Sequence, residues 1–361
     1  MNKIGFLRGV DKYCGNVLIA FLSVFNLKKK KLSGKKVLII RLWTLGESLL
    51  TLPLIEKLKE EGFDVTVLVS SRSKSVFENK GYKVLDVKQS LKFFKAFDIV
   101  IDTEPYFRVS AILSKYLGKT TIGFGNLFRA KLYDFKIKYD DKTHSVINFC
   151  RLLEPLGLEY KPDSLVPLNY TEKDKETVDS LLTEFNLVNK KIIGIHAGTA
   201  ETAPWRSWKK EKFAKLIDFL TKDGFHIVLT GSKSDAKVNK DIVDKVLNKE
   251  RVFDFSGKTN LSELAYLMTK FKVFISNDTG PMHLSAAMRT KTIGLFGPNL
   301  PERFAPFGRG NVGIYKASNL ECSPCINVHK GEFKKCKLNG KCMELIEVED
   351  VYNNVLKLVR L

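Results

Sequence analysis

Short apolar runs rich in β-branched residues alternate with longer amphipathic stretches along most of the chain, from residue 36 onward. The runs are predominantly apolar, as in 36–42 and 64–69, which is the pattern of strands buried on both faces of a parallel sheet. Strands are therefore predicted at 36–42, 64–69, 83–87, 98–102 and 121–124, and then at 191–196, 226–230, 251–255, 272–276 and 292–296.

The stretches between these strands have helical periodicity, as in 45–61, 210–222 and 261–270, and are long enough for right-handed crossovers. A Pro-containing, charged stretch at about 159–190 separates the two series, and 361 residues exceed what one core usually supports. We therefore predict an α/β protein with two Rossmann-like, doubly wound domains facing a cleft. The predicted parts are an N-terminal segment at 1–34, domains at 35–165 and 175–345, and a C-terminal helix at 346–361.

The first 36 residues are strongly basic and contain a single acidic residue, Asp11. The apolar run 17–25 is too short to span a bilayer and lacks a small-residue cleavage site. An apolar helix beside a lysine cluster suits the headgroup region of the cytoplasmic membrane face, and the alternative is a helix packed on the protein. The sequence predicts a cytoplasmic protein, peripheral on the inner face of that membrane, with no transmembrane span. The basic residues are Lys3, Arg8, Lys12, Lys28–Lys31, Lys35 and Lys36.

The whole chain carries a formal net charge of +20, from 60 basic and 40 acidic residues spread along its length. This excess favours an anionic partner such as a nucleotide, an acidic lipid surface, a phosphorylated glycan or nucleic acid, although solvated lysine-rich surfaces would account for it equally well. No nucleic-acid-binding motif is present, which speaks against that class. Neither first strand leads into Gly-x-Gly-x-x-Gly, which speaks against a nicotinamide-dependent oxidoreductase.

The turn after the first predicted strand contains Gly46 and Glu47. Glycine permits close backbone approach, and Glu47 falls at a helix start, where unpaired N–H groups favour a negative side chain. A carboxylate at the carboxyl end of a strand is a candidate general base. The alternative is a first-turn glutamate that only stabilises its helix.

The segment 276–284, Ser-Asn-Asp-Thr-Gly-Pro-Met-His-Leu, joins a predicted strand to a predicted helix. Pro281 suits the first helical turn, and Asp278 or Thr279 can cap it. Such a turn leaves several N–H groups pointing outward, where a phosphate can bind, and His283 could donate to an anionic oxygen. Helix capping alone would explain the same pattern.

Other small-residue turns follow strands of the second series. Gly198 precedes the run 204–209, Pro-Trp-Arg-Ser-Trp-Lys, whose Arg206 offers charge for a diphosphate and whose aromatic rings offer a face for a base. Trp208 could instead be a core residue. Gly231 follows the next strand, so several turns are expected at one sheet edge, where open parallel sheets bind ligands.

Four of the six cysteines, Cys322, Cys325, Cys336 and Cys342, lie in one short stretch. Disulfides are not expected without a secretory signal. The ligand types suit a structural zinc site, but the second pair is spaced by five residues rather than two. Free thiols in a loop are the alternative to a metal site.

These turns together resemble glycosyltransferase family 9, the lipopolysaccharide heptosyltransferases, over about residues 36–346. The Asp-Thr-Gly-Pro-x-His segment at 278–283 is specific, and the other segments are moderately so. The resemblance is carried by residues 45–47, 196–198, 206–208, 230–232, 277–284, 295–298 and 322–325.

By that resemblance the fold is GT-B, with the acceptor on the first domain and the nucleotide sugar on the second. Arg41 and Gly46 fall on the acceptor side, and Glu47 takes the place of the family's proposed base, which is commonly Asp. Arg206 occupies the position where many members have Lys. The residues with an implied role in donor binding are Gly198, Arg206, Thr230, Gly231, Asp278, Thr279, Gly280, Pro281, Met282 and His283.

The resemblance also implies an inverting, single-displacement transfer of heptose from ADP-heptose to a lipopolysaccharide core or a related anionic, lipid-linked glycan. No Asp-x-Asp occurs in the chain, so neither a catalytic metal nor a further cofactor is expected. Glutamate in place of aspartate leaves the substrates open. The alternatives are a GT-B transferase or epimerase with another nucleotide sugar and, from a different class, a nucleic-acid-binding protein.

Overall fold

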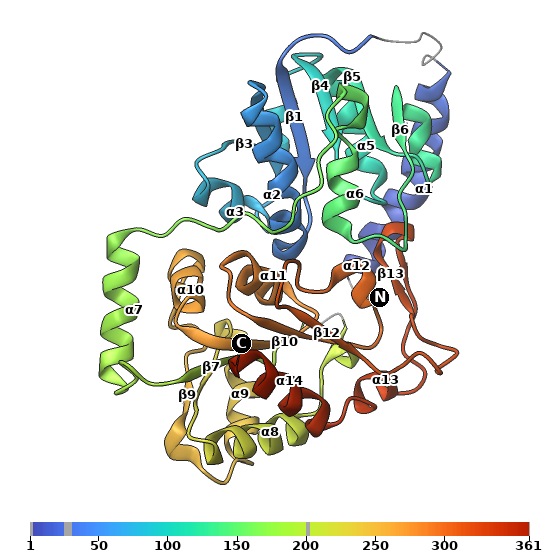
Figure 1. The fold of residues 1–361 in the computed structure, drawn as a ribbon. Helices are drawn as coiled ribbons and strands as arrows, with labels where there is room; N and C mark the ends of the chain where they lie inside the picture. Colours follow the sequence, from blue (N-terminus) through green and yellow to red (C-terminus); the bar gives the residue numbers. More distant parts are fainter. Residues whose placement is uncertain (1–2, 25–30, 200–202, 361) are drawn as a thin grey trace. The chain divides into compact units, whose positions relative to one another are not determined.

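The computed structural model describes residues 3–24, 31–199 and 203–360. They form two compact units, coloured along the chain in Figure 1. The first unit comprises Met1–Pro162 and Asn327–Phe333, and the second unit comprises Asp163–Ile326 and Lys334–Leu361. The segment Asn327–Phe333 therefore joins the first unit, although it lies within the sequence range predicted for the second domain.

The first unit is built on a parallel six-stranded sheet with the order β3-β2-β1-β4-β5-β6. β1 and β4 are neighbours at its centre, where Ile40 pairs with Asp102. The residues that follow these two strands consequently meet at the same edge of the sheet. The strands are β1 (Lys36–Arg41), β2 (Asp64–Val69), β3 (Lys83–Asp86), β4 (Phe97–Asp102), β5 (Gly118–Phe124) and β6 (Phe135–Ile137).

Helices of the first unit connect these strands, with α2 packed against β2 and α5 against β4 and β5. The short helix η6 and the strand β14 come from the returning segment Asn327–Phe333. The helices are α1 (Lys3–Ser23), α2 (Leu45–Glu60), α3 (Lys74–Asn79), α4 (Val87–Ser90), α5 (Arg108–Leu117), α6 (Ser145–Arg151), and the 3₁₀ helices η1 (Phe128–Leu132), η2 (Glu154–Leu156) and η6 (Val328–Lys330); β14 is Glu332–Phe333 and pairs with β13 (Ile326–Asn327).

The N-terminal helix α1 packs on α5 and η1. Ile19 is fully buried in a cluster with Ala111 and Leu132, and the Asp11 carboxylate accepts hydrogen bonds from the backbone N–H groups of Arg108 and Val109 at the start of α5. The packing alternative is thus what the structure shows for one face of α1. Among the described residues no helix is long and apolar enough to cross a membrane, and Lys28–Lys30 of the predicted basic cluster lie outside the described residues.

The opposite face of α1 exposes large apolar side chains. Val17 is 74% exposed and Phe21 63%, although both are residues that would normally be buried. We call this face the apolar stripe. Its members are Tyr13, Val17, Leu18, Phe21 and Val24.

The second unit repeats the architecture of the first, with a parallel six-stranded sheet in the order β12-β11-β10-β7-β8-β9. Counted from β7, this is the strand order of the first sheet and of doubly wound, Rossmann-type folds. The ends of β8, β7 and β10 are consequently neighbours. The strands are β7 (Ile192–His196), β8 (His226–Leu229), β9 (Val252–Asp254), β10 (Phe271–Asn277), β11 (Thr292–Phe296) and β12 (Val312–Tyr315).

In Figure 1, α8, α9 and α14 lie on one face of this sheet, and α10 and α11 on the other. The amphipathic C-terminal helix α14 buries Val351, Val355 and Leu358 beside α8. The helices are α7 (Glu172–Glu184), α8 (Lys210–Lys222), α9 (Ala236–Val243), α10 (Leu261–Met268), α11 (Gly280–Ala287), α12 (Pro301–Phe304), α13 (Lys341–Glu344), α14 (Val348–Arg360), and the 3₁₀ helices η3 (Pro204–Arg206), η4 (Lys233–Asp235) and η5 (Lys249–Arg251).

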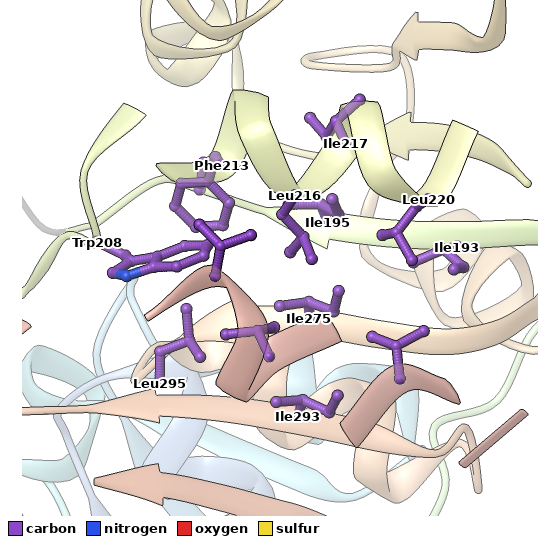
Figure 2. Packing of buried hydrophobic residues seen from close by; sticks show 14 of the residues in the cluster. Ile193, Ile195, Trp208, Phe213, Leu216, Ile217, Leu220, Ile275, Ile293 and Leu295 are labelled. Atoms are coloured by element: carbon purple, nitrogen blue, oxygen red, sulfur yellow. The ribbon is translucent and has the colours of Figure 1, made fainter. Parts of the chain in front are cut away.

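The core of the second unit lies between α8 and the sheet. Figure 2 shows Leu216 and Leu220 of α8 facing Ile193 and Ile195 of β7, and all four side chains are fully buried. Trp208 closes one end of this core, next to Phe213. A rigid apolar core of this kind fixes the ends of β7 and β10, which carry the candidate donor site.

The predicted α/β fold with two doubly wound sheets is confirmed. The predicted series missed β6 and β12, the last strand of each sheet. β6 has only three residues, one of them Lys136, and β12 has only four, so both are short edge strands with a weak apolar signal.

Candidate active site

Glu47 lies in the first turn of α2, just beyond the end of β1. Its backbone N–H donates to the Thr44 hydroxyl oxygen at 3.4 Å, and that hydroxyl donates to Oε2 of Glu47 at 3.2 Å. Thr44 caps the helix with φ at 48°, in the left-handed region that non-glycine residues rarely adopt. Glu47 is buried, at 8% exposed, and the Thr44 hydroxyl and Arg41 hold its carboxylate in a defined position. Gly46 beside it is buried.

Arg41, at the end of β1, is a fully buried cation. Its Nη2 donates to the Thr103 carbonyl oxygen at 2.8 Å, and its guanidinium carbon lies 5.1 Å from the Phe149 ring centroid. Nη1 lies 3.5 Å from Oε2 of Glu47, and Nε lies 3.4 Å from Oε1 of Glu104. Arg41 therefore acts as a shared cation for two carboxylates rather than as an exposed acceptor ligand.

Glu104, which the sequence did not single out, is the third member of this cluster. It follows β4, is fully buried, and accepts hydrogen bonds at Oε1 from the backbone N–H groups of Leu42 at 2.6 Å and Trp43 at 3.0 Å. Burial raises the pKa of Glu104 to about 7, against the lowering effect of Arg41 and with further raising by Glu47 and Asp102. The signal available in the sequence was its place directly after β4, the strand next to β1.

The returning segment Asn327–Phe333 belongs to the first unit, where it contacts Tyr139 and Tyr106. The His329 ring stacks on the Tyr139 ring at a centroid distance of 3.4 Å, and the Tyr139 hydroxyl lies 3.0 Å from that of Ser145. Burial raises the pKa of Tyr139, and the negative charge of Glu47 raises it further. Tyr139 thus lies within electrostatic range of Glu47.

In the second unit, Asn277 at the end of β10 joins three chain segments. Its side-chain N–H donates to the Ala197 carbonyl oxygen at 2.9 Å, and its side-chain oxygen accepts from the Trp208 backbone N–H at 3.0 Å. These bonds hold the loop after β7 and the start of α8 against the end of β10. The turns expected at one sheet edge are therefore brought together here.

Arg206 and Asp278 form an ion pair, with Nη2 of Arg206 2.6 Å from Oδ2 of Asp278. The same nitrogen also donates to the Asp278 carbonyl oxygen, and the Asn299 side-chain N–H donates to Oδ2 at 3.2 Å. The Arg206 side chain is 24% exposed, whereas that of Asp278 is 9% exposed. Asp278 therefore positions the guanidinium, and Arg206 presents it towards solvent.

Thr279 is the N-cap residue of α11, but its side chain makes no capping hydrogen bond. The expected side-chain cap is wrong, because the Thr279 hydroxyl bonds instead to the Asn277 carbonyl oxygen at 3.2 Å and lies 3.1 Å from the Ser276 hydroxyl. Thr279, Gly280 and Pro281 are partly exposed. In this first turn Pro281 has no N–H and the Met282 N–H donates to the Thr279 carbonyl oxygen at 3.2 Å, so the Gly280 N–H is the group that the helix start offers without a side-chain cap.

Met282 and His283 follow inside α11 and are buried. Met282 is fully buried against Gly294 of β11, where an added Cβ would lie 2.4 Å from its sulfur. Its place is in the core, so its predicted role in donor binding reduces to holding α11 on the sheet. His283 is 4% exposed and its ring lies 6.5 Å from that of Phe304.

Gly198 and Gly231 face the same neighbour, Asp235. A Cβ on Gly198 would lie 2.4 Å from Oδ1 of Asp235, and one on Gly231 would lie 2.7 Å from the Asp235 Cβ. These glycines therefore accommodate Asp235, which caps η4. Thr230 is 2% exposed and its hydroxyl donates to the Ile195 carbonyl oxygen at 3.3 Å, so its side chain links the residue after β8 to the end of β7.

Trp208 is a core residue, which confirms the alternative given for it: it is 1% exposed and its indole N–H donates to the Ile346 carbonyl oxygen at 3.0 Å. All six cysteines are free thiols. Among the described residues, which include the four clustered cysteines, no group of three or more His, Cys, Asp and Glu is arranged to hold a metal ion. Cys325 and Cys342 nevertheless lie within electrostatic range of Cys322 and Cys336: burial raises the pKa of both thiols, and the neighbouring thiols raise it further. The metal site therefore stays a prediction.

The two units define the class of protein. Each is a Rossmann-type sheet; the first carries a carboxylate at a strand end, and the second carries an arginine beside an uncapped helix start. This is the GT-B architecture of enzymes that use nucleotide sugars, and the chain is a glycosyltransferase. It belongs to glycosyltransferase family 9 (heptosyltransferase), whose family model matches residues 84–336.

Curated relatives support the family. Lipooligosaccharide heptosyltransferase 2 of Haemophilus influenzae is 34% identical over 122 residues, which cover 33% of this chain and 35% of that relative. Lipopolysaccharide heptosyltransferase 3 of Escherichia coli is 25% identical over 346 residues, covering 87% of this chain and 95% of that relative. The first match thus spans about a third of its relative's length, and the second spans nearly all.

Solved structures share the fold. A glycosyl transferase family 9 protein from Veillonella parvula has a TM-score of 0.74 at 22% identity, covering 92% of this chain and 99% of that one. ADP-heptose LPS heptosyltransferase II of E. coli has a TM-score of 0.69 at 18% identity, covering 90% and 98%. Both alignments extend across the two units.

Proposed function

We propose that the protein is an inverting heptosyltransferase that transfers heptose from ADP-heptose to a lipopolysaccharide core or a related lipid-linked glycan. The observation that carries this proposal is the carboxylate of Glu47, held at the carboxyl edge of β1 by Arg41 and Thr44 in a family 9 chain. The printed names of the relatives, heptosyltransferases for lipopolysaccharide or lipooligosaccharide, support the donor and the acceptor.

The donor diphosphate binds at the start of α11 in this proposal. Arg206 supplies a positive charge, and the backbone N–H of Gly280, at the positive end of the helix, supplies a directed hydrogen bond. Both stabilise the negative charge that develops on the leaving nucleoside diphosphate. Because these groups belong to the chain, we expect transfer to need no divalent ion, which activity in the presence of a chelator tests.

Glu47 acts as general base on the acceptor. It takes the proton from the attacking hydroxyl while that oxygen bonds to the anomeric carbon, and the bond from that carbon to the diphosphate oxygen breaks. The nucleophile enters opposite the leaving group, so the configuration inverts. The extra methylene of glutamate, relative to the family's aspartate, shifts the carboxylate by about one bond length, which we relate to a difference in acceptor geometry.

The same proposal places the protein on an anionic membrane surface, where a lipid-linked acceptor resides. The apolar stripe of α1 offers side chains that can enter the headgroup region, and the surrounding residues 1–36 carry nine basic residues against one acidic residue. The inward face of α1 is occupied by α5 and η1, and among its described side chains the apolar stripe is presented for docking.

A donor screen tests the proposal. We expect ADP-heptose to raise the melting temperature more than UDP-, GDP- or CMP-sugars, and to support transfer to heptose-deficient lipopolysaccharide. If another nucleotide sugar stabilised the protein and ADP-heptose did not, that sugar would be the donor. Interconversion of sugar epimers without an acceptor would indicate an epimerase. Salt-dependent binding to random DNA without any response to nucleotide sugars would contradict the enzyme assignment.

A further inference from the structure

The fully buried Glu104 is not used by the reaction proposed above, yet it contacts Arg41 and the two residues that follow it in the turn that presents Glu47. Its Oε1 accepts two backbone N–H groups and lies 3.4 Å from Nε of Arg41. Its Oε2 is buried and has no hydrogen-bond partner within the described residues. A buried carboxylate with one unsatisfied oxygen is costly, so a compensating role is expected.

We propose that Glu104 is a positioning residue for the glycosyl transfer: it fixes the turn between β1 and α2 and shares Arg41 with Glu47, and its charge thereby keeps Glu47 basic. This inference rests on the proposed role of Glu47 as general base. Glu104 reaches the acceptor only through Arg41, Glu47 and the turn.

The backbone contacts explain the positioning. Leu42 and Trp43 lie between Arg41 and Thr44, and their N–H groups both point to one carboxylate oxygen of Glu104. The next residue, Thr44, has φ at 48° and caps the helix that carries Glu47. Glu104 thus holds the chain at the residues where it turns from strand to helix, and a displacement of about 1 Å in a reacting group can lower a rate about 100-fold.

The charges explain the effect on basicity. Arg41, Glu47 and Asp102 act on Glu104 electrostatically, and Arg129 interacts with it from η1. When Glu104 is ionised, its charge offsets part of the attraction between Arg41 and the Glu47 carboxylate, and Glu47 binds a proton more readily. When Glu104 is protonated, Arg41 acts on Glu47 alone and weakens it as a base. Since burial raises the pKa of Glu104 to about 7, both states are populated near neutral pH.

Two substitutions separate the charge from the hydrogen bonds. Glu104→Gln keeps a side-chain oxygen for the two N–H groups and removes the charge, whereas Glu104→Asp keeps the charge and shortens the reach. A matched control is Glu60→Gln, the same chemical change at an exposed position of α2. ADP affinity and melting temperature are measured for each variant alongside kcat/KM from pH 5 to 9.

For wild type we expect kcat/KM to rise with pH through about 7, where Glu104 ionises and Glu47 becomes the stronger base. For Glu104→Gln we expect this rise to be lost, so that kcat/KM is about tenfold below wild type at pH 8 to 9 and equal to it below about pH 6, where Glu104 is protonated in wild type as well. ADP affinity should be unchanged. Glu104→Asp should keep the rise at a reduced rate, and Glu60→Gln should match wild type throughout. If Glu104→Gln unfolds, Glu104→Asp still decides: loss of the rise with the charge retained contradicts the proposal.

The inference and the proposed function can fail separately. A Glu104→Gln profile that superimposes on the wild-type profile would overturn the role of Glu104 while Glu47→Gln remains inactive. Retained turnover in Glu47→Gln would overturn the proposed base itself, whatever Glu104 does. A parallel loss of ADP affinity and melting temperature in Glu104→Gln would reduce Glu104 to a purely structural residue.

Discussion

Arg206 and Asp278 are joined twice in the second unit, because Nη2 of Arg206 contacts both the carboxylate, at 2.6 Å, and the backbone carbonyl oxygen of Asp278. An arginine proposed to bind a diphosphate is therefore already partly neutralised. The ion pair weakens the attraction between Arg206 and an anionic ligand. It also fixes the direction of the guanidinium, so that less side-chain entropy is lost when the ligand binds. The two residues should consequently respond differently to substitution.

We expect Arg206→Ala to weaken ADP binding by roughly 10- to 100-fold, since a hydrogen bond to a charged group contributes about 1.5–3 kcal/mol. Asp278→Asn should weaken it less, because loss of orientation is offset by removal of a nearby negative charge. Arg206→Lys tests the direction of the side chain, and Arg251→Ala, a partly exposed arginine elsewhere in the second unit, is the control. Calorimetric titration with ADP decides, and an Arg206→Ala affinity equal to wild type would remove Arg206 from the donor site.

Glu47→Gln should bind ADP as wild type does but lose turnover by at least about 100-fold, because general-base catalysis contributes roughly 10²–10⁴. Glu47→Asp restores the residue common in the family and keeps the carboxylate, so we expect intermediate activity. Single-turnover transfer under saturating donor separates chemistry from product release. The proposed base is wrong if the Gln variant turns over within a few-fold of wild type.

The buried Glu104 should also impose a pH dependence on stability. Its pKa is about 7 in the folded protein and near 4.5 when unfolded, so the folded state holds the proton more tightly. The resulting stabilisation is fully present below about pH 4.5 and is lost as the pH rises through 7. We expect the melting temperature of Glu104→Gln, relative to wild type, to increase by several degrees from pH 5 to pH 8. A difference that is constant with pH would contradict the raised pKa.

The apolar stripe should be needed for membrane binding. We expect Val17→Asp/Phe21→Asp to abolish co-sedimentation with vesicles of anionic phospholipid that contain no acceptor glycan, while neutral vesicles bind neither protein. A matched control is Val188→Asp/Leu247→Asp, which changes exposed apolar residues of the second unit. Unchanged sedimentation would contradict the membrane role. A change in oligomeric mass instead would make the stripe an interface between copies of the chain.

Much of the fold could be predicted because parallel strands that are buried on both faces consist mainly of apolar residues. The runs at 64–69 and 292–296 match β2 and β11 residue for residue. β6 and β12 lie at sheet edges, where a short pairing suffices and the run becomes too weak to read. No sequence pattern indicates that Asn327–Phe333 joins the first unit, because its place depends on contacts between residues far apart in sequence.

The site was predictable where a local turn carried the signal, as at Glu47 and Asp278. It was not predictable where the function of a residue depends on a neighbouring strand. Glu104 follows β4 in a Thr-Glu-Pro sequence that has no motif, and only the pairing of β4 with β1 places it under the Glu47 turn. Gly198 and Gly231 were predicted from local turns to lie close to a bound ligand. In the structure the space beside both glycines is occupied by Asp235, a neighbour that the turns themselves do not reveal.

The returning segment Asn327–Phe333 limits how the two units can be exchanged between relatives. The backbone leaves the first unit after Pro162, re-enters it at Asn327 and leaves it again after Phe333, so no single cut in the gene separates two complete units. A hybrid enzyme that takes its donor half from a relative would import a foreign partner for Tyr139 in place of His329. We therefore expect a hybrid of two family members to be functional only when residues 327–333 come from the same relative as the acceptor half.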